Sequence, residues 1–267
     1  MITIKIGGSV VDDLHESTIL DIKKTSIEQG LVIVHGGAKE VTKVSKQIGR
    51  EPKFVTSPSG IKSRYTDAET ANIFTMVMTG RIGKNIVRIL QKNGINAIGL
   101  SGIDGRLIQA ERKKKLLVIN DKGRKQMIDG GYTGKITKVD SDFIKYLIER
   151  KMVPVISPVA TSEEYDFLNV DGDRAAAYVA GAIKSDCVLF ITNVDGLWDK
   201  DKNIIKHLDL QYAKEIRPTI GPGMEKKVLA SIEAIEMGVN TAIIANGKRE
   251  NPISEALKHK ECTVIER

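Results

Sequence analysis

The sequence predicts an α/β protein, a three-layer α/β/α sandwich around a mainly parallel central sheet. Short apolar runs alternate with amphipathic stretches along the 267 residues, and several of the apolar runs end at glycine. Strands that are buried on both faces are nearly continuous apolar runs, and the helices between them supply the right-handed crossovers of a parallel sheet. A chain of this length can bury a large core, as one domain or two lobes, without a disulfide framework.

The expected elements follow one another in regular alternation. Runs of β-branched and aliphatic residues predict strands at 3–6, 31–37, 95–102, 116–120, 153–159, 187–196, 240–247 and 262–266. Apolar residues at helical spacing predict helices at 17–30, 67–94, 140–151, 171–185 and 223–238. Ligands of such sheets bind beyond the carboxyl ends of the strands, which is where the glycine turns of this chain cluster.

The segment from Asp104 to Val139 departs from this alternation. Its short β runs, its many lysines and the turn at 121–123 predict antiparallel hairpins set on the parallel core. A soft boundary at 157–166 divides the chain into an N-terminal lobe, 1–165, and a C-terminal lobe, 166–267, and we expect one continuous sheet to join them.

Composition narrows the classes of function. The net charge of +7 suits an acidic partner, whether nucleic acid, nucleotide or protein, but 4% aromatic residues leave few platforms for stacking single-stranded bases. Cys187 and Cys262 lie in apolar runs and are predicted to be reduced core or edge residues, as in a reducing compartment. No membrane-length apolar stretch or signal-peptide pattern is present, so we expect a soluble, cytoplasmic protein.

Lys5 stands in the middle of the first predicted strand, directly before the turn Gly7-Gly8-Ser9. A lysine in a buried strand is costly unless it meets an anion. A second turn, Gly36-Gly37-Ala38, follows the next strand, and such turns free backbone N–H groups and aim a helix N-terminus at an anion. Each turn alone is equally an ordinary tight turn, whereas the pair favours an anion site. No P-loop or GxGxxG motif is present, so a bound phosphate would be held by another design.

Arg64 is predicted to lie in a loop ahead of the long helix at 67–94. An arginine there can clamp a carboxylate with two parallel hydrogen bonds, and the alternative is a solvated loop arginine.

Polar residues at alternate positions precede the helix predicted at 171–185. One of Asn169, Asp171 and Asp173 is expected to cap that helix, and all three together suggest the positioning of cations or of a metal-bound phosphate. Lys226 and Lys227 open a later helix, where an anion would offset their unfavourable interaction with the helix dipole, unless solvent simply surrounds them.

Five motifs together resemble the amino acid kinase family. KIGGS, VIVHGGA, LNVDGDRAA, ITNVDGLWD and GPGMEKKV occur in the family's order and at similar separations, over essentially the entire chain. The most similar members are the acetylglutamate kinases and the sister enzymes that phosphorylate glutamate or 2-aminoadipate attached to the amino-group carrier protein LysW, in lysine and arginine biosynthesis. The resemblance implies a carbamate kinase-like fold and phosphoryl transfer from ATP to a side-chain carboxylate, which gives an acyl phosphate.

The resemblance also implies roles for individual residues. Lys5 and Lys227 are expected to touch the transferring phosphate and Asp173 to hold the two lysines in place. The expected substrate-binding residues are Gly36, Gly37, Ala38, Arg64 and Asn169. The expected nucleotide-binding residues are Gly7, Gly8, Ser9, Thr192, Asn193, Asp195, Gly196, Gly221, Gly223 and Met224. Mg²⁺ is expected on the ATP phosphates with no metal ligand from the protein, the N-terminal lobe would bind substrate and carrier, and the C-terminal lobe would bind ATP.

Departures from the acetylglutamate kinase pattern concern the substrate. Ala38 replaces a third glycine, and the segments SRYT at 63–66 and GGYTGK at 130–135 look like those of the carrier-dependent enzymes. Their carrier is a small acidic protein, which we expect to dock on a basic hairpin with Arg112, Lys113, Lys114, Lys115, Lys122, Arg124 and Lys125.

Three alternatives stay open. An acetylglutamate kinase acting on the free small molecule is the chief rival, the basic hairpin can be merely solvated, and a nucleic-acid-binding module would fit the charge alone. No extra helix precedes the first strand, so a homodimer without arginine feedback is expected.

Overall fold

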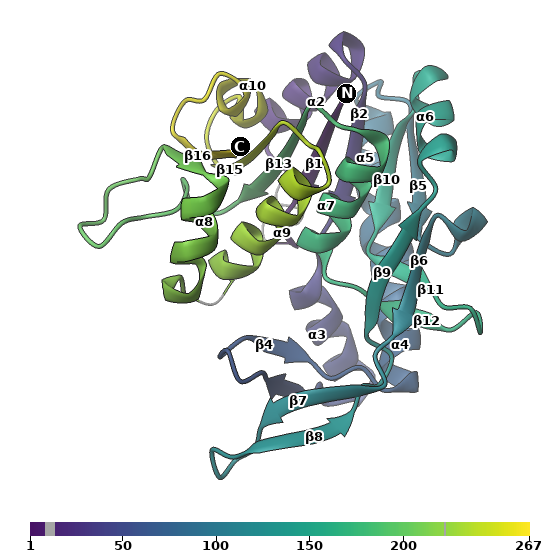
Figure 1. Cartoon of the computed structure of the whole chain (residues 1–267). Helices are drawn as coiled ribbons and strands as arrows, with labels where there is room; N and C mark the ends of the chain where they lie inside the picture. The colour runs from purple at the N-terminus through teal and green to yellow at the C-terminus, as the bar shows by residue number, and fades with distance from the viewer. Residues whose placement is uncertain (9–13, 222) are drawn as a thin grey trace.

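An eight-stranded sheet forms the centre of the molecule (Figure 1). A computed structural model describes residues 1–8, 14–221 and 223–267. The strand order is β14-β16-β15-β13-β1-β2-β10-β5. The strands are β1 (Ile2–Ile6), β2 (Leu31–His35), β5 (Ala97–Ser101), β10 (Val153–Ser157), β13 (Cys187–Thr192), β14 (His207–Asp209), β15 (Thr241–Asn246) and β16 (Cys262–Glu266). Neighbouring strands pair in parallel except for β15 and β16, which are antiparallel.

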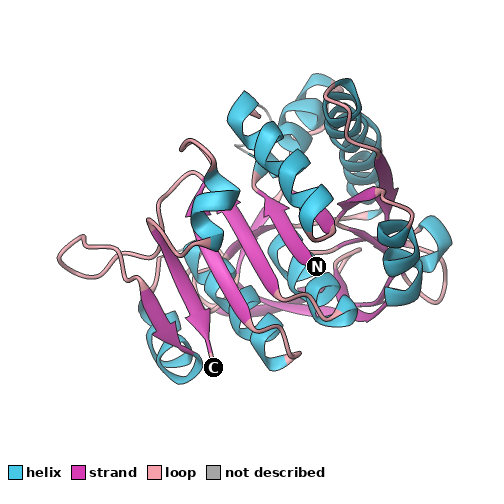
Figure 2. Ribbon diagram, turned by 90° about the horizontal axis from the view of Figure 1, so that it is seen from above, coloured by secondary structure: helices cyan, strands magenta, loops and turns pink. Residues whose placement is uncertain are grey.

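Helices cover both faces of this sheet (Figure 2). One apolar cluster contains side chains of the sheet together with side chains of α2 (Glu16–Glu28), α3 (Ala38–Gln47), α4 (Ala68–Thr75), α5 (Lys84–Lys92) and α10 (Pro252–Leu257). A second cluster joins the opposite face to α6 (Ser141–Glu149), α7 (Gly172–Ile183), α8 (Leu210–Ile216) and α9 (Met224–Glu236). The predicted three-layer α/β/α sandwich with a mainly parallel sheet is confirmed.

The alternation of side chains along β1 decides where Lys5 points. Ile2, Ile4 and Ile6 belong to the first cluster, so Thr3 and Lys5 face the layer that contains α7. The Thr3 hydroxyl lies 2.7 Å from the hydroxyl of Ser185, just beyond the end of α7. A strand that is apolar on one face therefore delivers its lysine to the other face.

Two smaller sheets extend from the central one. One has the order β12-β11-β6-β9 and the other the order β4-β3-β7-β8. Their strands are β3 (Phe54–Thr56), β4 (Lys62–Arg64), β6 (Ile108–Arg112), β7 (Lys115–Ile119), β8 (Lys125–Asp129), β9 (Gly134–Val139), β11 (Val159–Thr161) and β12 (Phe167–Asn169). The β3/β4/β7/β8 sheet lies below the main body in Figure 1, next to α3. The antiparallel pairs β6–β9 and β7–β8 confirm the predicted hairpin character of this segment.

Two local predictions were wrong. Arg64 is not in a loop: it ends β4 and pairs with Phe54 of β3, whose ring lies 5.1 Å from the guanidinium carbon, so strand pairing and a cation–π contact hold it. The run 112–115 is not part of one hairpin, because Arg112 ends β6 and Lys115 begins β7 in a different sheet.

The helix predicted at 67–94 is continuous but not uniform. Its middle, Met76–Gly83 (η1), is π-helical, and α4 and α5 flank it. Long π-helical segments are rare and occur most often near functional sites. Short 3₁₀ turns lie at Asp104–Arg106 (η2) and Arg217–Thr219 (η3).

The predicted lobe boundary falls in the antiparallel pair β11–β12, while the central sheet takes strands from both sides of it. The functional division into lobes at 165 and 166 stays a prediction.

Both cysteines are buried in strands, β13 and β16. None of the helices in the described ranges has the length and apolar character that crossing a bilayer requires.

Candidate active site

Lys5, Asp173 and Lys227 form a trio at the junction of β1, α7 and α9, in which Lys5 and Asp173 are buried and the Lys227 side chain is 13% exposed; we call it the buried trio after its central carboxylate. The Lys5 Nζ lies 2.7 Å from Asp173 Oδ1, and the Lys227 Nζ lies 3.2 Å from Asp173 Oδ2. Lys5 is 7% exposed and Asp173 6%. Lys5 lies 168 positions before Asp173 in the sequence, and Lys227 lies 54 positions after it. The fold nevertheless places both ammonium groups on the one carboxylate. The predicted arrangement of two lysines around Asp173 is present in the geometry.

The charges in the trio do not balance. Burial alone would raise the pKa of Asp173, but the charges of Lys5 and Lys227 more than offset this effect, so its pKa lies below the usual range. Two cations therefore share one ionised carboxylate. The excess positive charge is held in a nearly dry position, where it acts strongly on an approaching anion.

The turn before α7 fixes the position of Asp173. Asp171 is the N-cap of α7, because its carboxylate accepts hydrogen bonds from the backbone N–H groups of Asp173 (2.9 Å) and Arg174 (3.2 Å). The expectation that one of the three polar residues caps this helix is confirmed. Lys226 pairs with Asp171 at 3.5 Å, so the neighbouring lysines 226 and 227 contact different carboxylates.

The two glycine turns face each other beside Lys5. The Gly36 N–H donates to the Ile6 carbonyl at 2.8 Å, and a methyl group at Gly8 would come within 3.0 Å of the Gly37 nitrogen. A methyl group at Gly36 would lie 3.6 Å from the Lys5 Nζ. Only glycine permits this close approach of two backbones. The anion site itself stays a prediction. Ser9 lies outside the described residues.

Arg64 lies next to the second turn and keeps a free donor. Its Nη2 donates to the Ala38 carbonyl at 3.0 Å and to the Thr42 hydroxyl at 2.7 Å. Its Nη1 is buried and has no hydrogen-bond partner among the described residues, and burial lowers the pKa of the guanidinium. A buried N–H without a partner is costly, so this group suits an incoming carboxylate.

Asn169 joins the two segments in which the sequence departs from the acetylglutamate kinases. Its Nδ2 donates to the Thr66 hydroxyl at 2.9 Å, and its backbone N–H donates to the Tyr132 carbonyl at 2.9 Å. The Tyr132 N–H in turn donates to the Thr66 carbonyl at 2.6 Å, and a methyl group at Gly131 would lie 2.3 Å from that same carbonyl oxygen. The segments 63–66 and 130–135 are therefore packed as one unit.

The predicted nucleotide-binding residues fall into separate places. Gly7 adjoins the end of β13, since its N–H donates to the Ile191 carbonyl at 2.9 Å and Thr192 follows that residue. Gly221 and Gly223 precede Met224 at the start of α9, and a methyl group at either glycine would meet no atom of the described residues within 4 Å. The described residues around these two glycines thus leave space before the helix that contains Lys227.

Asp195 and Gly196 follow β13 and contact residues of β15, β16 and the segment between them, while Asn193 is exposed. The Asp195 carboxylate accepts from the Asn246 amide at 2.9 Å and from the Arg249 Nε at 2.7 Å. A methyl group at Gly196 would lie 2.5 Å from the Thr263 hydroxyl. These contacts explain both residue types by packing and pairing within the protein.

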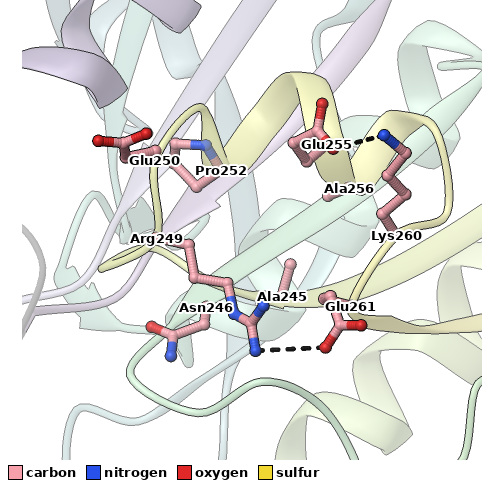
Figure 3. Close-up of a pocket in the computed structure, with 9 residues that line it drawn as sticks. All are labelled: Ala245, Asn246, Arg249, Glu250, Pro252, Glu255, Ala256, Lys260 and Glu261. Carbon is pink, nitrogen blue, oxygen red and sulfur yellow. Dashed lines mark ion pairs between the residues drawn. The ribbon is translucent and has the colours of Figure 1, made fainter.

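A pocket of about 360 Å³ lies beyond β15, beside α10 (Figure 3). Four of its charged side chains form two ion pairs, Arg249 with Glu261 and Lys260 with Glu255. None of the described members of the predicted site lines it, and Asp195 links it to them through contacts with Asn246 and Arg249. Its remaining lining residues are Ala245, Glu250, Pro252 and Ala256.

Sequence reasoning missed the groups that hold the trio in place. The Arg174 guanidinium makes two hydrogen bonds to Glu233, of 2.9 and 2.6 Å, and so ties α7 to α9. Arg174 and Glu233 are 59 residues apart, and nothing at either sequence position indicates the other.

Sequence reasoning also gave no role to His35, which lies at the end of β2 and is fully buried. Burial lowers its pKa to about 4, so the imidazole is neutral at pH 7.

No group of three or more His, Cys, Asp or Glu side chains that could hold a metal ion occurs within residues 1–8, 14–221 and 223–267. The described donors are instead cations and backbone N–H groups, which fit the phosphates of a nucleotide. Chemically the site can receive two anions, one at the trio and one at Arg64.

Comparison with known proteins identifies the family of this chain. A model of the Amino acid kinase family matches residues 1–246. A protein of Nitrosopumilus maritimus named "putative LysW-aminoadipate/LysW-glutamate kinase" is 71% identical over 266 residues, which cover 100% of this chain and 99% of that protein. A LysW-aminoadipate/LysW-glutamate kinase of Saccharolobus islandicus is 43% identical over 266 residues, 99% of each chain.

Solved structures show the same fold at low sequence identity. N-acetylglutamate synthase of Neisseria gonorrhoeae has a TM-score of 0.81 and 20% identity, over 100% of this chain and 59% of that chain. A Giardia carbamate kinase has a TM-score of 0.65 and 14% identity, over 100% of this chain and 98% of that chain. With a family model that spans most of its length and close relatives over all of it, the chain belongs to the amino acid kinase family.

Proposed function

We propose that this protein transfers the γ-phosphoryl group of ATP to the side-chain carboxylate of 2-aminoadipate or glutamate attached to a LysW-type carrier protein. The product would be an acyl phosphate of lysine or arginine biosynthesis. The buried trio is the observation that supports the proposal most strongly, because it keeps two ammonium groups on one ionised aspartate beside two glycine turns. The names of the full-length relatives supply the substrate class.

The residue types suit a carboxylate nucleophile. Such a group, with a pKa near 4.3, is already ionised at neutral pH and needs no general base. His35, the histidine nearest the site, is neutral and buried and is not needed to accept a proton. The barrier is the approach of two anions and the spread of charge over the phosphoryl oxygens, which fixed cations and N–H groups offset.

The two predicted anion positions would bind different groups of the reactants. Lys5 and Lys227 would stabilise the phosphoryl group in transfer, and Asp173 would keep their ammonium groups apart and in place. Arg64, with its unpartnered Nη1, would receive a carboxylate of the amino-acid portion. Mg²⁺ would be carried on the ATP phosphates and would neutralise part of their charge. The open space before α9 would receive the phosphates at the helix N-terminus.

The carrier would dock on the basic surface of the β3/β4/β7/β8 sheet. Lys122, Arg124 and Lys125 are exposed at the β7–β8 turn and give this surface its charge. Arg112 and Lys113 differ from them: Arg112 stacks on Tyr132 at 4.1 Å, and Lys113 is half-buried near Arg174 and Asp171. The turn residues are therefore the better candidates for steering an acidic protein. A homodimer and a cytoplasmic location remain proposals that rest on the resemblance.

A side-by-side assay tests the proposal. ATP turnover would be measured with carrier-linked aminoadipate, carrier-linked glutamate and free N-acetylglutamate at equal concentrations. We expect turnover with one or both carrier-linked substrates and little with the free compound. Robust turnover on the free compound alone would identify an acetylglutamate kinase instead.

A further inference from the structure

His35 makes two hydrogen bonds, one with each ring nitrogen, although it lies outside the trio. Its Nδ1 lies 3.1 Å from the Gly36 carbonyl oxygen, and its Nε2 lies 2.8 Å from the Ser157 hydroxyl. A carbonyl oxygen can only accept, so Nδ1 must bear the proton. The neutral ring then has a lone pair on Nε2, and the single proton of the Ser157 hydroxyl is shared between that nitrogen at 2.8 Å and the Met78 carbonyl at 3.2 Å.

Residues of β10 and of the π-helical segment η1 pack around the imidazole ring. Ser157 ends β10, and its hydroxyl also lies 3.2 Å from the Met78 carbonyl in the π-helical segment η1. A methyl group at Gly83 would lie 3.1 Å from the Ser157 oxygen and 3.4 Å from the His35 Nε2. The imidazole is thus clamped between the end of β10 and η1.

The same π-helical segment packs on the glycine turn. A methyl group at Gly37 would lie 2.1 Å from the Ile82 Cδ1 and 2.9 Å from the Met78 sulfur, both in η1. Gly37 therefore fits against η1 on one side, while its nitrogen faces Gly8 on the other. The position of this peptide group is set by groups that do not touch the trio.

The orientation of the Gly36–Gly37 peptide follows from the His35 contact. In a planar trans peptide the C=O and N–H groups point in opposite directions. Because the Gly36 carbonyl faces His35, the Gly37 N–H points the other way, and the Gly37 nitrogen lies close to Gly8, 3.0 Å from where a methyl group there would stand. No acceptor for the Gly37 N–H is found among the described residues.

We propose that His35 is a positioning residue, whose Nδ1–H fixes the Gly36–Gly37 peptide so that the Gly37 N–H is presented to the anion bound between the two glycine turns. This role rests on the proposed function, since the anion is the substrate carboxylate or the phosphoryl group of that reaction. His35 itself touches neither reactant.

Two substitutions at position 35 separate the two ring nitrogens. His35→Asn keeps an N–H donor at the place of Nδ1, whereas His35→Gln moves the amide toward Ser157 and loses the bond to the Gly36 carbonyl. We expect kcat/KM for the carrier-linked substrate to fall about 100-fold in His35→Gln, the loss typical of a misplaced binding group. It should stay within about tenfold of wild type in His35→Asn and in Ser157→Ala, which each lose one neutral hydrogen bond.

Two further readouts distinguish positioning from a general loss of structure. The KM for ATP and the midpoint of thermal unfolding should be alike in His35→Asn and His35→Gln. Equal losses of kcat/KM in both variants, or near wild-type activity in His35→Gln, would overturn the proposal.

The tautomer can also be measured in the unmodified protein. Nitrogen-15 spectra of histidine-labelled wild type should show His35 protonated on Nδ1 and unprotonated on Nε2, and the opposite tautomer would overturn the proposal even if neither variant folds. An inactive wild type on every substrate would refute the proposed function, while this spectrum would still report on the His35 geometry.

Discussion

Lysines occur in two contrasting settings in this molecule. Lys5 is 7% exposed and bonded to Asp173, whereas Lys122 and Lys125 stand at an exposed turn of the β3/β4/β7/β8 sheet. The buried cation has given up its water and is fixed by a rigid strand, so it acts at short range on one anion. The exposed cations are surrounded by water and screened by salt, so they act over the distance of a Debye length on any acidic surface. In the proposed function, the same residue type would therefore support phosphoryl transfer in one place and the encounter with the carrier in the other.

The largest expected effect comes from removing the negative charge of Asp173, which both Lys5 and Lys227 contact. Asp173→Asn leaves Lys5 and Lys227 close together without a counter-ion, which should lower the free energy of unfolding by about 3–5 kcal/mol. Urea denaturation with the Asp171→Asn variant as control measures it, because asparagine remains a good N-cap at that half-buried position. Equal stability of the two variants would show that the buried pairing contributes nothing.

Acidification should affect the same trio. The pKa of Asp173 is below its usual value, so its contribution to stability is fully present above the ordinary aspartate pKa of about 3.9 and is lost as the pH falls further. The Asp173→Asn variant should lack this part of the acid dependence.

Next in size is the loss of one transferring cation. Lys227→Ala should lower kcat by about 10²-fold to 10³-fold, because a fixed donor to the developing charge is gone. Lys226→Ala is a matched control from the adjacent position, where the ammonium pairs with Asp171 at 3.5 Å instead, and its kcat should fall much less. Comparable losses in both variants would remove the distinction between the two lysines.

The smallest expected effect concerns the exposed turn. Reversing the charges of Lys122, Arg124 and Lys125 to glutamate should raise KM for the carrier-linked substrate about tenfold at low salt and leave kcat unchanged. The difference from wild type should fade at high salt, since exposed charges are screened.

A second triple variant controls for net charge. Lys23, Lys24 and Lys92 are exposed on α2 and α5, and their reversal changes the total charge by the same amount. An equal rise of KM in this variant would show that total charge, not a docking surface, attracts the carrier.

Much of the fold could be predicted because its signals are local. Continuous apolar runs marked the central strands except β14, and the polar group Asn169, Asp171 and Asp173 marked the start of α7, which Asp171 caps. The assignment of Arg64 to a loop failed since its strand is only three residues long and depends on pairing with Phe54, which no local pattern reports.

Part of the candidate site could be predicted because its residues lie in local sequence motifs. Lys5, Asp173 and Lys227 could be named from motifs, and the structure brings them together. His35, Ser157 and the π-helical turn at Met78 were missed, since a buried histidine in an apolar strand gives no sign of its partner 122 residues away. Contacts of this kind exist only once the chain has folded.

The central claim is that the buried trio drives phosphoryl transfer to a carboxylate oxygen, and trapping the product with hydroxylamine tests it most directly. Wild-type protein with ATP, Mg²⁺ and carrier-linked aminoadipate or glutamate should form a hydroxamate in step with ADP, and Lys227→Ala should form almost none. Release of ADP without hydroxamate in the wild type, or undiminished hydroxamate in Lys227→Ala, would contradict the account.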